Sequence, residues 1–328
     1  MALFSRRGKP EKSRDPAPDD EVEQADTEAL ADAEQVPYVG ISVSTFGAPP
    51  PQRAPSPPPR PAAVAPPATQ SVPGVVDNVV LKAALAALPE KPQSTDVMNV
   101  MRQTLQGQLY VRAQGDAQAL LAAGQPLNLA IATREDKRFL LAFTGGAALQ
   151  QSARAEAAAA TSAIGQPAAS VLRGAVAGGY DGVYLDHASS GARLILPVPL
   201  IDKALKEGEP GLVLKALLAG ARSDQTASQI VEALTRVPVW VAGGTDAEGR
   251  MGLAQAQTPD GRRRLEVFSH PLEVLALGRG DRPLPLRPEQ LAKAIASEAA
   301  LTGVVVDPGG PWFELDRDAL AQLLALAD

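Results

Sequence analysis

Within this chain of 328 residues, one short stretch gathers the side chains that nucleophilic catalysis uses. Asp186, His187, Ser189 and Ser190 supply an acid, an imidazole and two hydroxyls, which act together when their geometry aligns. Aspartate and serine also favour turns, because their side chains hydrogen-bond the neighbouring backbone. The four residues are almost consecutive and directly follow an apolar run, so we expect a turn here rather than a catalytic site.

The other candidates for chemistry are weaker. His270 follows Ser269 with no acid fixed beside it, and we expect it in a loop or at the start of a helix. Gly243, Gly244 and Gly249 lie between two predicted strands, outside any glycine pattern that opens a helix for phosphate binding. The chain has two histidines and no cysteine, which excludes disulfides, thiol nucleophiles and cysteine-ligated metals. We therefore predict no catalytic residues, no cofactor and no metal ion, and hence a protein that is not an enzyme.

Charge and composition limit the classes of partner. Residues 1–14 are basic, residues 15–34 hold nine acidic residues and no basic one, and the net charge of the chain is -6. The remainder is nearly neutral, so it lacks the basic surface that phosphate neutralisation needs, and its few aromatics offer little base stacking. No apolar run reaches the length of a membrane span. We expect a cytoplasmic protein that binds neither nucleic acid nor membrane.

We predict that residues 1–73 form a disordered tail. Its acidic run, residues 15–34, buries too little apolar surface to fold. Residues 49–67 hold ten of the chain's 30 prolines, a composition that favours extended polyproline II. This proline-rich linker contains PxxP patterns of the kind that aromatic grooves bind, but the pattern is loose and fits a semi-rigid spacer better.

One apolar segment interrupts this tail. In VPYVGISVSTF, residues 36–46, apolar residues alternate with small or polar ones, which indicates an extended strand with one buried face. Such a strand adds to the edge of a sheet, either in this chain or in a partner. The sequence leaves both alternatives open, beside a third in which the segment does not dock.

Six residues are predicted to contact a protein partner. Five belong to this apolar segment, and the sixth is a tryptophan that has no aromatic counterpart in the internal repeat and is expected beside its strand at the surface. They are Tyr38, Val39, Ile41, Val43, Phe46 and Trp312.

The rest of the chain repeats once. VVLKAALA at 79–86 matches LVLKALLA at 212–219. Four residues of the first copy lie 121 positions before their counterparts in the second: Pro167, Tyr180, Gly182 and Asp186 before Pro288, Leu301, Gly303 and Asp307. Matches at one fixed offset indicate a duplicated unit. We predict two homologous domains, at 74–207 and 208–328.

Each copy is predicted to combine helices with a mixed sheet. Ser94 or Thr95 caps a helix over 96–106, which has a counterpart at 225–235. Pro167 and Pro288 start helices, because a proline in the first turn has no hydrogen bond to lose. Strands are predicted at 108–113, 127–133, 138–144, 182–186 and 192–196 in the first copy, and at 303–307 and 311–315 in the second.

These patterns are similar to those of a known family. The hairpin ending in AFTGG, followed by a helix and GVYLDHASSGARLILP, resembles the N-terminal domain family of SseB, the enhanced serine sensitivity protein. The second copy, with VFSHP and GVVVDPGGPWFEL, resembles a more diverged member. The resemblance covers roughly residues 74–328 and implies an α+β fold with no established catalytic residues.

Three functions follow as hypotheses. The first is a non-catalytic interaction or regulatory protein with a protein partner, because two domains without catalytic motifs are joined to a long tail with one apolar segment. The alternative is a sensor that binds a small molecule between the two copies, since domain interfaces often form concave sites. The third, more distant, is an enzyme of unknown reaction. The sequence indicates neither the partner nor the oligomeric state.

Overall fold

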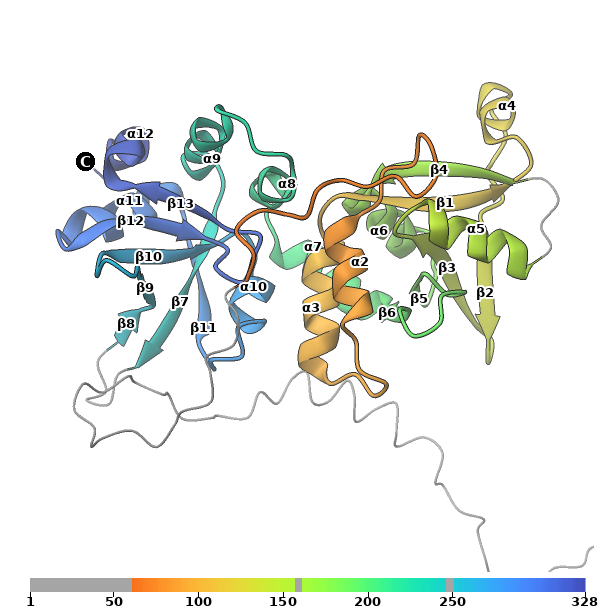
Figure 1. Ribbon diagram of the computed structural model, residues 1–328, viewed down its shortest axis with the longest axis horizontal. Helices are drawn as coiled ribbons and strands as arrows, with labels where there is room; N and C mark the ends of the chain where they lie inside the picture. Colours follow the sequence, from red (N-terminus) through yellow and green to blue (C-terminus); the bar gives the residue numbers. More distant parts are fainter. Residues whose placement is uncertain (1–60, 157–160, 246–250, 328) are drawn as a thin grey trace, which may run out of the picture. The chain divides into compact units, whose positions relative to one another are not determined.

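The structure, a computed structural model, describes residues 61–156, 161–245 and 251–327 (Figure 1). The predicted acidic run at 15–34, the apolar segment 36–46 and the linker up to residue 60 lie outside the described residues. The described residues all fall in one unit, Gly40–Asp328, and build two sheets with flanking helices, one from each predicted copy. The predicted α+β fold with two tandem domains is confirmed.

Copy 1 is a mixed sheet in the order β4-β1-β3-β5-β6, with β2 paired to β3. The neighbours β3 and β5 run parallel, and the other pairs are antiparallel. Its strands are β1 (Gln108–Gln114), β2 (Ile131–Arg134), β3 (Lys137–Phe143), β4 (Thr161–Pro167), β5 (Gly182–Leu185) and β6 (Leu194–Pro197). Its helices are α2 (Val79–Ala86), α3 (Ser94–Thr104), α4 (Ala117–Ala122), α5 (Gly146–Ala155), α6 (Ala168–Ala177) and α7 (Val198–Glu207).

Copy 2 repeats this order as β11-β7-β10-β12-β13, with β10 and β12 parallel. Its strands are β7 (Val239–Thr245), β8 (Met251–Leu253), β9 (Gln255–Gln257), β10 (Arg263–Phe268), β11 (Arg282–Leu286), β12 (Leu301–Val306) and β13 (Phe313–Asp316). Its helices are α8 (Val213–Ala219), α9 (Thr226–Leu234), α10 (Pro271–Leu275), α11 (Pro288–Ser297), the 3-10 turn η1 (Arg317–Leu320) and α12 (Ala321–Leu324). The equal strand order confirms the duplication.

Each sheet buries both faces. In copy 1 one face packs on α2, α3, α6 and α7, through residues such as Leu85, Leu172 and Val183. The opposite face holds a smaller cluster with α5, centred on Phe143, and its counterpart in copy 2 is centred on Phe268. Both phenylalanines are fully buried, and each is followed by a hydroxyl residue, Thr144 or Ser269.

Local geometry differs from the sequence predictions at three places. Helix α3 begins at Ser94 and its cap is Gln93, whose backbone N–H donates to the Asp96 carboxylate at 2.8 Å, so the predicted Ser94 or Thr95 cap is wrong. Strand β2 starts at Ile131 rather than 127. The edge strands β4 and β11 were not predicted, because glycine and proline interrupt their apolar pattern.

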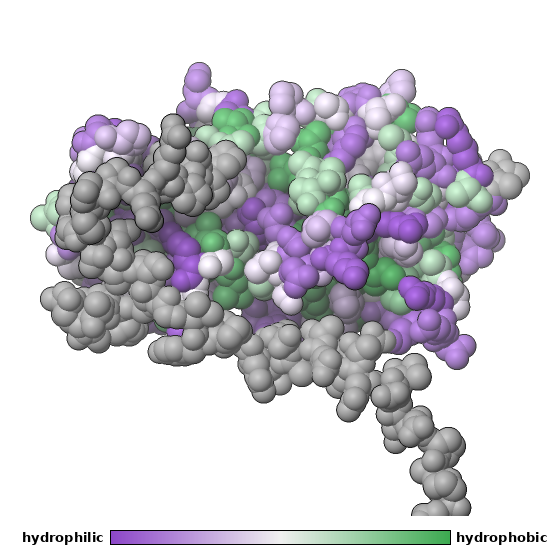
Figure 2. All heavy atoms as spheres, turned by 60° about the horizontal axis from the view of Figure 1, so that its bottom comes forward, coloured by the Kyte–Doolittle hydropathy of each residue, from purple (hydrophilic) through white to green (hydrophobic). Residues whose placement is uncertain are grey.

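The surface shows no single dominant apolar region in the view of Figure 2, where apolar residues are scattered among polar ones. Along the described part of the chain, no helix is long and apolar enough to cross a membrane.

Candidate functional site

The carboxyl ends of β3 and β5 meet in copy 1, and an acid and a hydroxyl lie there. Asp186, directly after β5, accepts hydrogen bonds from the Thr144 backbone N–H at 2.8 Å and from Thr144 Oγ1 at 2.6 Å. Asp186 adopts a left-handed backbone, with φ of 46°, which an aspartate tolerates better than most residues. The pair ties the turn after β3 to the turn after β5.

Copy 2 contains the same arrangement. Asp307, after β12, accepts from the Ser269 backbone N–H at 2.7 Å and from Ser269 Oγ at 2.5 Å. Its φ is 50°. We call these two arrangements the acid–hydroxyl latches. Their repetition explains why both copies have a hydroxyl residue after Phe143 or Phe268 and an aspartate directly after the next parallel strand.

Both latch acids are buried, and this changes their protonation. Burial raises the pKa of Asp186 to about 6, while the hydrogen bonds from Thr144 oppose the rise. Burial and the nearby Glu273 carboxylate raise the pKa of Asp307 to about 7. Since both oxygens of each acid accept bonds from the neighbouring residue, the latches serve to hold two turns together.

The predicted acid, imidazole and hydroxyl of the DHASS stretch do not converge. Ser189 Oγ donates to Gln151 at 2.8 Å, and His187 Nε2 lies 3.3 Å from the Glu156 carboxylate. The Ser189 backbone N–H closes a turn onto the carbonyl of Asp186 at 2.8 Å. The stretch is therefore a turn, as the sequence predicts.

A buried ionic cluster joins the two copies. Glu273 on α10 pairs with Arg102 of α3, in copy 1, at 2.7 Å, and with Lys215 of α8. Burial alone would raise the pKa of Glu273, but Lys215 and Arg102 hold it below its ordinary value. Arg102 also donates to the carbonyl oxygens of Gly309 and Gly310 at 3.1 and 3.0 Å. We call Arg102, Lys215 and Glu273 the junction cluster, in which the buried carboxylate is paired with one cation from each copy.

His270 belongs to the same junction. It caps α10, with Nδ1 accepting from the Leu272 N–H at 3.0 Å, so Nε2 carries the proton and donates to the Ala204 carbonyl of α7 at 2.8 Å. Burial and the neighbouring Lys215 charge lower the pKa of His270 to about 4. The predicted position at the start of a helix is confirmed, and the imidazole is neutral at pH 7.

Trp312 contacts the N-terminal segment of its own chain. Its indole Nε1 donates to the Pro61 carbonyl and its backbone N–H to the Ala63 carbonyl, each at 3.0 Å. The predicted surface residue is therefore half-buried. Residues 61–73, predicted as part of the disordered tail, contact both copies, since Thr69 and Ser71 donate to Asp77 of copy 1. The other predicted partner residues, Tyr38, Val39, Ile41, Val43 and Phe46, lie outside the described residues.

Strand β4 is one of the two edge strands of the copy 1 sheet, and β6 is the other (Figure 1). The Ala168 N–H donates to Gly107 at 3.0 Å, and hydrogen-bonding residues alternate along an antiparallel pair. Thr161, Ala163 and Gly165 therefore direct their N–H and C=O groups away from the sheet. All three residues are exposed, and these groups have no hydrogen-bond partner among the described residues. We call them the open edge.

The corresponding edge of copy 2 is closed. Ala242 of β7 accepts from Ala254 at 2.8 Å, so it faces away from β11 and its paired residue, Pro283, directs its nitrogen outward. Pro285 lies two residues on and has the same orientation. Proline has no N–H to offer, and prolines on edge strands prevent pairing with other strands.

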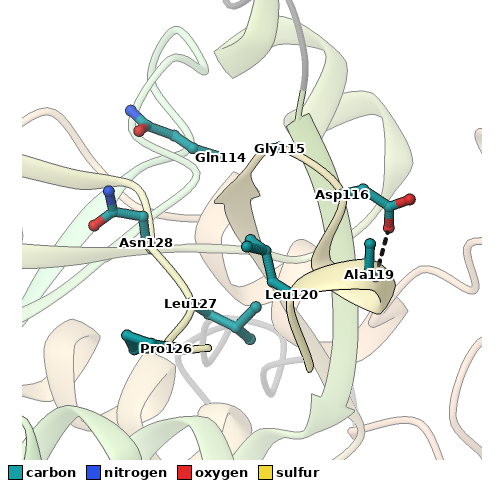
Figure 3. Close-up of a pocket in the computed structure, with 8 residues that line it drawn as sticks. All are labelled: Gln114, Gly115, Asp116, Ala119, Leu120, Pro126, Leu127 and Asn128. Carbon is teal, nitrogen blue, oxygen red and sulfur yellow. Dashed lines mark hydrogen bonds between the residues drawn. The ribbon is translucent and has the colours of Figure 1, made fainter. Parts of the chain in front are cut away.

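A pocket of about 570 Å³ lies near one end of the open edge, wholly within copy 1. It is formed by the end of β1, by α4 and by residues 126–128 (Figure 3). Its one carboxylate, Asp116, accepts from the N–H groups of Gln118 and Ala119 and so caps α4. Among the residues that the structure describes, no cluster of three histidine or acidic side chains could hold a metal ion.

Two features of the structure, the junction cluster and the edge strands β4 and β11, were not predicted from the sequence. The junction cluster had a weak signal, the lysine Lys215 inside the apolar helix LVLKALLA, because a buried charge in such a run needs a partner. The edge strands also had one, since the alternating prolines of RPLPL fit a strand whose outward positions need no donor.

Comparison with known proteins identifies the fold family. The SseB protein N-terminal domain family matches the chain twice, at residues 81–200 and 213–322. The chain therefore belongs to this family, with two tandem copies of the domain. Searches of curated proteins and of solved structures found no match.

Proposed function

We propose that this tandem SseB-family protein is a non-catalytic interaction protein that binds an extended segment of a protein partner along the open edge of β4. The observation that carries the proposal is the contrast between the two copies. Thr161, Ala163 and Gly165 offer unpaired backbone groups in copy 1, whereas Pro283 and Pro285 close the same edge in copy 2.

Strand addition explains how such an edge gives affinity. Each of the three outward residues offers one donor and one acceptor, and each net hydrogen bond contributes about 0.5–1.5 kcal/mol. Specificity then comes from alternate side chains of the added strand. On one face they meet Ile164, which packs at the border of the main core. On the other they meet Ala163 and Gly165, where small residues fit.

The contacts that the buried acids make within the fold support the non-catalytic part of the proposal. Asp186 and Asp307 hold turns together, and Glu273 joins the copies through two cations. Each of these carboxylates already has protein partners, so a reacting group would have to break the fold to reach them. The proposal keeps the cytoplasmic location expected from the sequence, which cell fractionation tests.

The test uses the full chain and a displayed library of random 12-residue peptides. Binders selected on the wild-type protein are measured against Ala163→Pro, which copies Pro283 into the open edge, and against Ala163→Ser, which keeps the N–H. We expect at least tenfold weaker binding to Ala163→Pro and little change for Ala163→Ser. Thr161→Pro serves as a second blocking variant if Ala163→Pro unfolds. Equal binding by the wild type and the proline variants would overturn the proposal.

A further inference from the structure

We propose that copy 2 carries a second binding surface, which takes a proline-rich segment of a protein partner. The surface is formed by Arg222, between α8 and α9, and by Trp312 and Phe313, where β13 begins. We call these three residues the Trp312 surface. It lies in the other copy from the open edge of β4 and differs from that edge in chemistry, so each site is tested separately.

A proline-rich segment of the chain itself lies on this surface. The Trp312 indole Nε1 donates to the carbonyl of Pro61, and the Trp312 backbone N–H donates to the carbonyl of Ala63, each at 3.0 Å. Arg222 Nη2 donates to the same Ala63 carbonyl at 3.2 Å. All three hydrogen bonds that the structure shows between the surface and this segment have their donor on the surface, so the surface recognises carbonyl oxygens.

Arg222 is held in place for this contact. Its guanidinium carbon lies over the ring of Phe313, 4.9 Å from the ring centroid, and its Nη2 also donates to the Trp312 carbonyl at 3.2 Å. A cation–π contact and a planar, rigid set of donors fix the orientation of the guanidinium. The donors of the surface are therefore positioned before a partner arrives.

A surface that donates favours a proline-rich ligand. Proline has no N–H, so it offers a carbonyl and leaves no donor unpaired. Polyproline II segments make no internal hydrogen bonds, which leaves their carbonyls free, and they dock on aromatic surfaces in known recognition modules. An added β-strand, in contrast, needs acceptors as well as donors. The Trp312 surface and the open edge therefore select different kinds of segment.

The chain's own segment is held in a way that a partner can replace. Pro61 and Ala62 are exposed, and Val64 is 52% exposed, so the side chains of the segment bury little apolar area here. Its hydrogen bonds use carbonyls, which any segment of suitable shape supplies. A ligand with prolines in place of Ala62 and Ala63 loses less conformational freedom on docking. A partner richer in proline therefore competes with residues 61–63.

Copy 1 has different residues at the matching place. Leu194 and Phe313 begin β6 and β13, where they pair with Leu185 and Val306 of the equivalent strands β5 and β12. The residue before Leu194 is Arg193, so copy 1 offers neither the indole donor nor the aromatic ring at this position. We therefore expect one proline-rich segment to bind per chain.

The experiment titrates the full chain with a fluorescein-labelled 12-residue peptide of repeated Pro-Pro-Ala and measures binding by fluorescence anisotropy. The matched peptide, repeated Gly-Gly-Ala, offers the same number of carbonyls without the fixed backbone of proline. NMR of the two indole N–H groups locates the site, because the only other tryptophan, Trp240, is buried in copy 2. We expect the Trp312 signal to shift with the proline peptide alone and the Trp240 signal to stay.

Variants of the full chain separate the surface from the segment that lies on it. Trp312→Phe removes the indole donor, and Arg222→Lys keeps the charge without the guanidinium, so each should weaken binding at least fivefold. Trp240→Phe is the matched control and should not change the affinity. P61G/A62G/A63G keeps every carbonyl of the chain's own segment but raises the entropy cost of its docking. The proline peptide should bind this variant at least threefold more tightly than it binds the wild type.

Each other outcome overturns the inference. Absence of binding to the wild type and to P61G/A62G/A63G, or equal binding of the two peptides, would show that the surface does not recognise proline-rich segments. Binding that leaves the Trp312 signal unchanged, or that Ala163→Pro abolishes, would place the peptide elsewhere. A Trp312 signal that changes on dilution without peptide would assign the surface to residues 61–63 of a second copy. None of these results bears on strand addition to β4, which the displayed peptide library tests.

Discussion

Ala163 and Pro283 occupy the same position in the outer strands of the two sheets. Ala163 pairs with Arg112 of β1, and Pro283 pairs with Ala242 of β7. Both backbone nitrogens point away from their sheet, but only that of Ala163 carries a hydrogen. One chain thus contains an open edge and, in the other copy of the same fold, an edge without donors at the matching positions.

The first prediction concerns the edge of β11, which Pro283 and Pro285 close to strand addition. Pro283→Ala with Pro285→Ala restores two outward N–H groups on β11, so an edge-binding peptide should find a second, weaker site on each molecule. Isothermal titration of the full chain measures the stoichiometry. Pro259→Ala, in the turn before β10, is the control and should leave one site. A stoichiometry unchanged by the double substitution would contradict the role given to the two prolines.

Removing the Glu273 carboxylate from the junction cluster should cause a large loss of stability. Glu273→Ala leaves Arg102 and Lys215 buried without their carboxylate, and breaking a buried ion pair costs about 3–5 kcal/mol. Chemical denaturation measures the free energy of unfolding. Glu232→Ala, which removes the exposed pair with Arg236 on α9, should cost less than about 1 kcal/mol. Similar small losses for both variants would show that the cluster does not hold the copies together.

The free energy of unfolding should depend on pH through Asp307, the acid of the latch in copy 2. The pKa of Asp307 rises from 3.8 to about 7 on folding, so the folded state binds more protons and its stability falls as pH rises through this range. Relative to the wild type, Asp307→Asn should gain stability between pH 4 and pH 8, by up to about 4 kcal/mol. Chemical denaturation of both proteins at several pH values in this range measures the difference in their free energies of unfolding. A stability difference independent of pH would mean that Asp307 ionises as readily folded as unfolded.

Phe143 and Phe268, which directly precede the latch hydroxyls, should contribute equally to the cores of the two copies. Phe143→Ala and Phe268→Ala each remove a fully buried ring and should cost about 3–5 kcal/mol. Leu121→Ala, at a position 58% exposed on α4, is the control and should change stability little. A large loss for one phenylalanine alone would show that the two copies do not depend on equivalent cores.

The parts of the fold that sequence predicts are those with local patterns. The apolar run ending in Asp307 predicts β12. The predicted strands 127–133 and 138–144 leave a short charged turn between them, and its residues Glu135 and Asp136 have φ of 50° and 65°. Pairing across long separations has no such signal. Arg102 and Glu273 are 171 positions apart, and nothing in either neighbourhood specifies the other.

The same limit applied to the candidate site. Strand β4 reads as TSAIGQP, in which small residues and glycine hide the strand pattern, and its importance lies in which backbone groups remain unpaired. That property depends on the register with β1 and on the absence of proline at Ala163 and Gly165. It becomes visible only beside the proline-bearing edge of copy 2.

The central claim is that the β4 edge takes an added strand. The most direct measurement is amide exchange at Ala163 and Gly165 of the full chain, before and after addition of a selected 12-residue peptide. We expect at least tenfold slower exchange at these two amides in the complex, with exchange at Gln166 unchanged. A peptide that binds while both amides exchange as fast as before would contradict it.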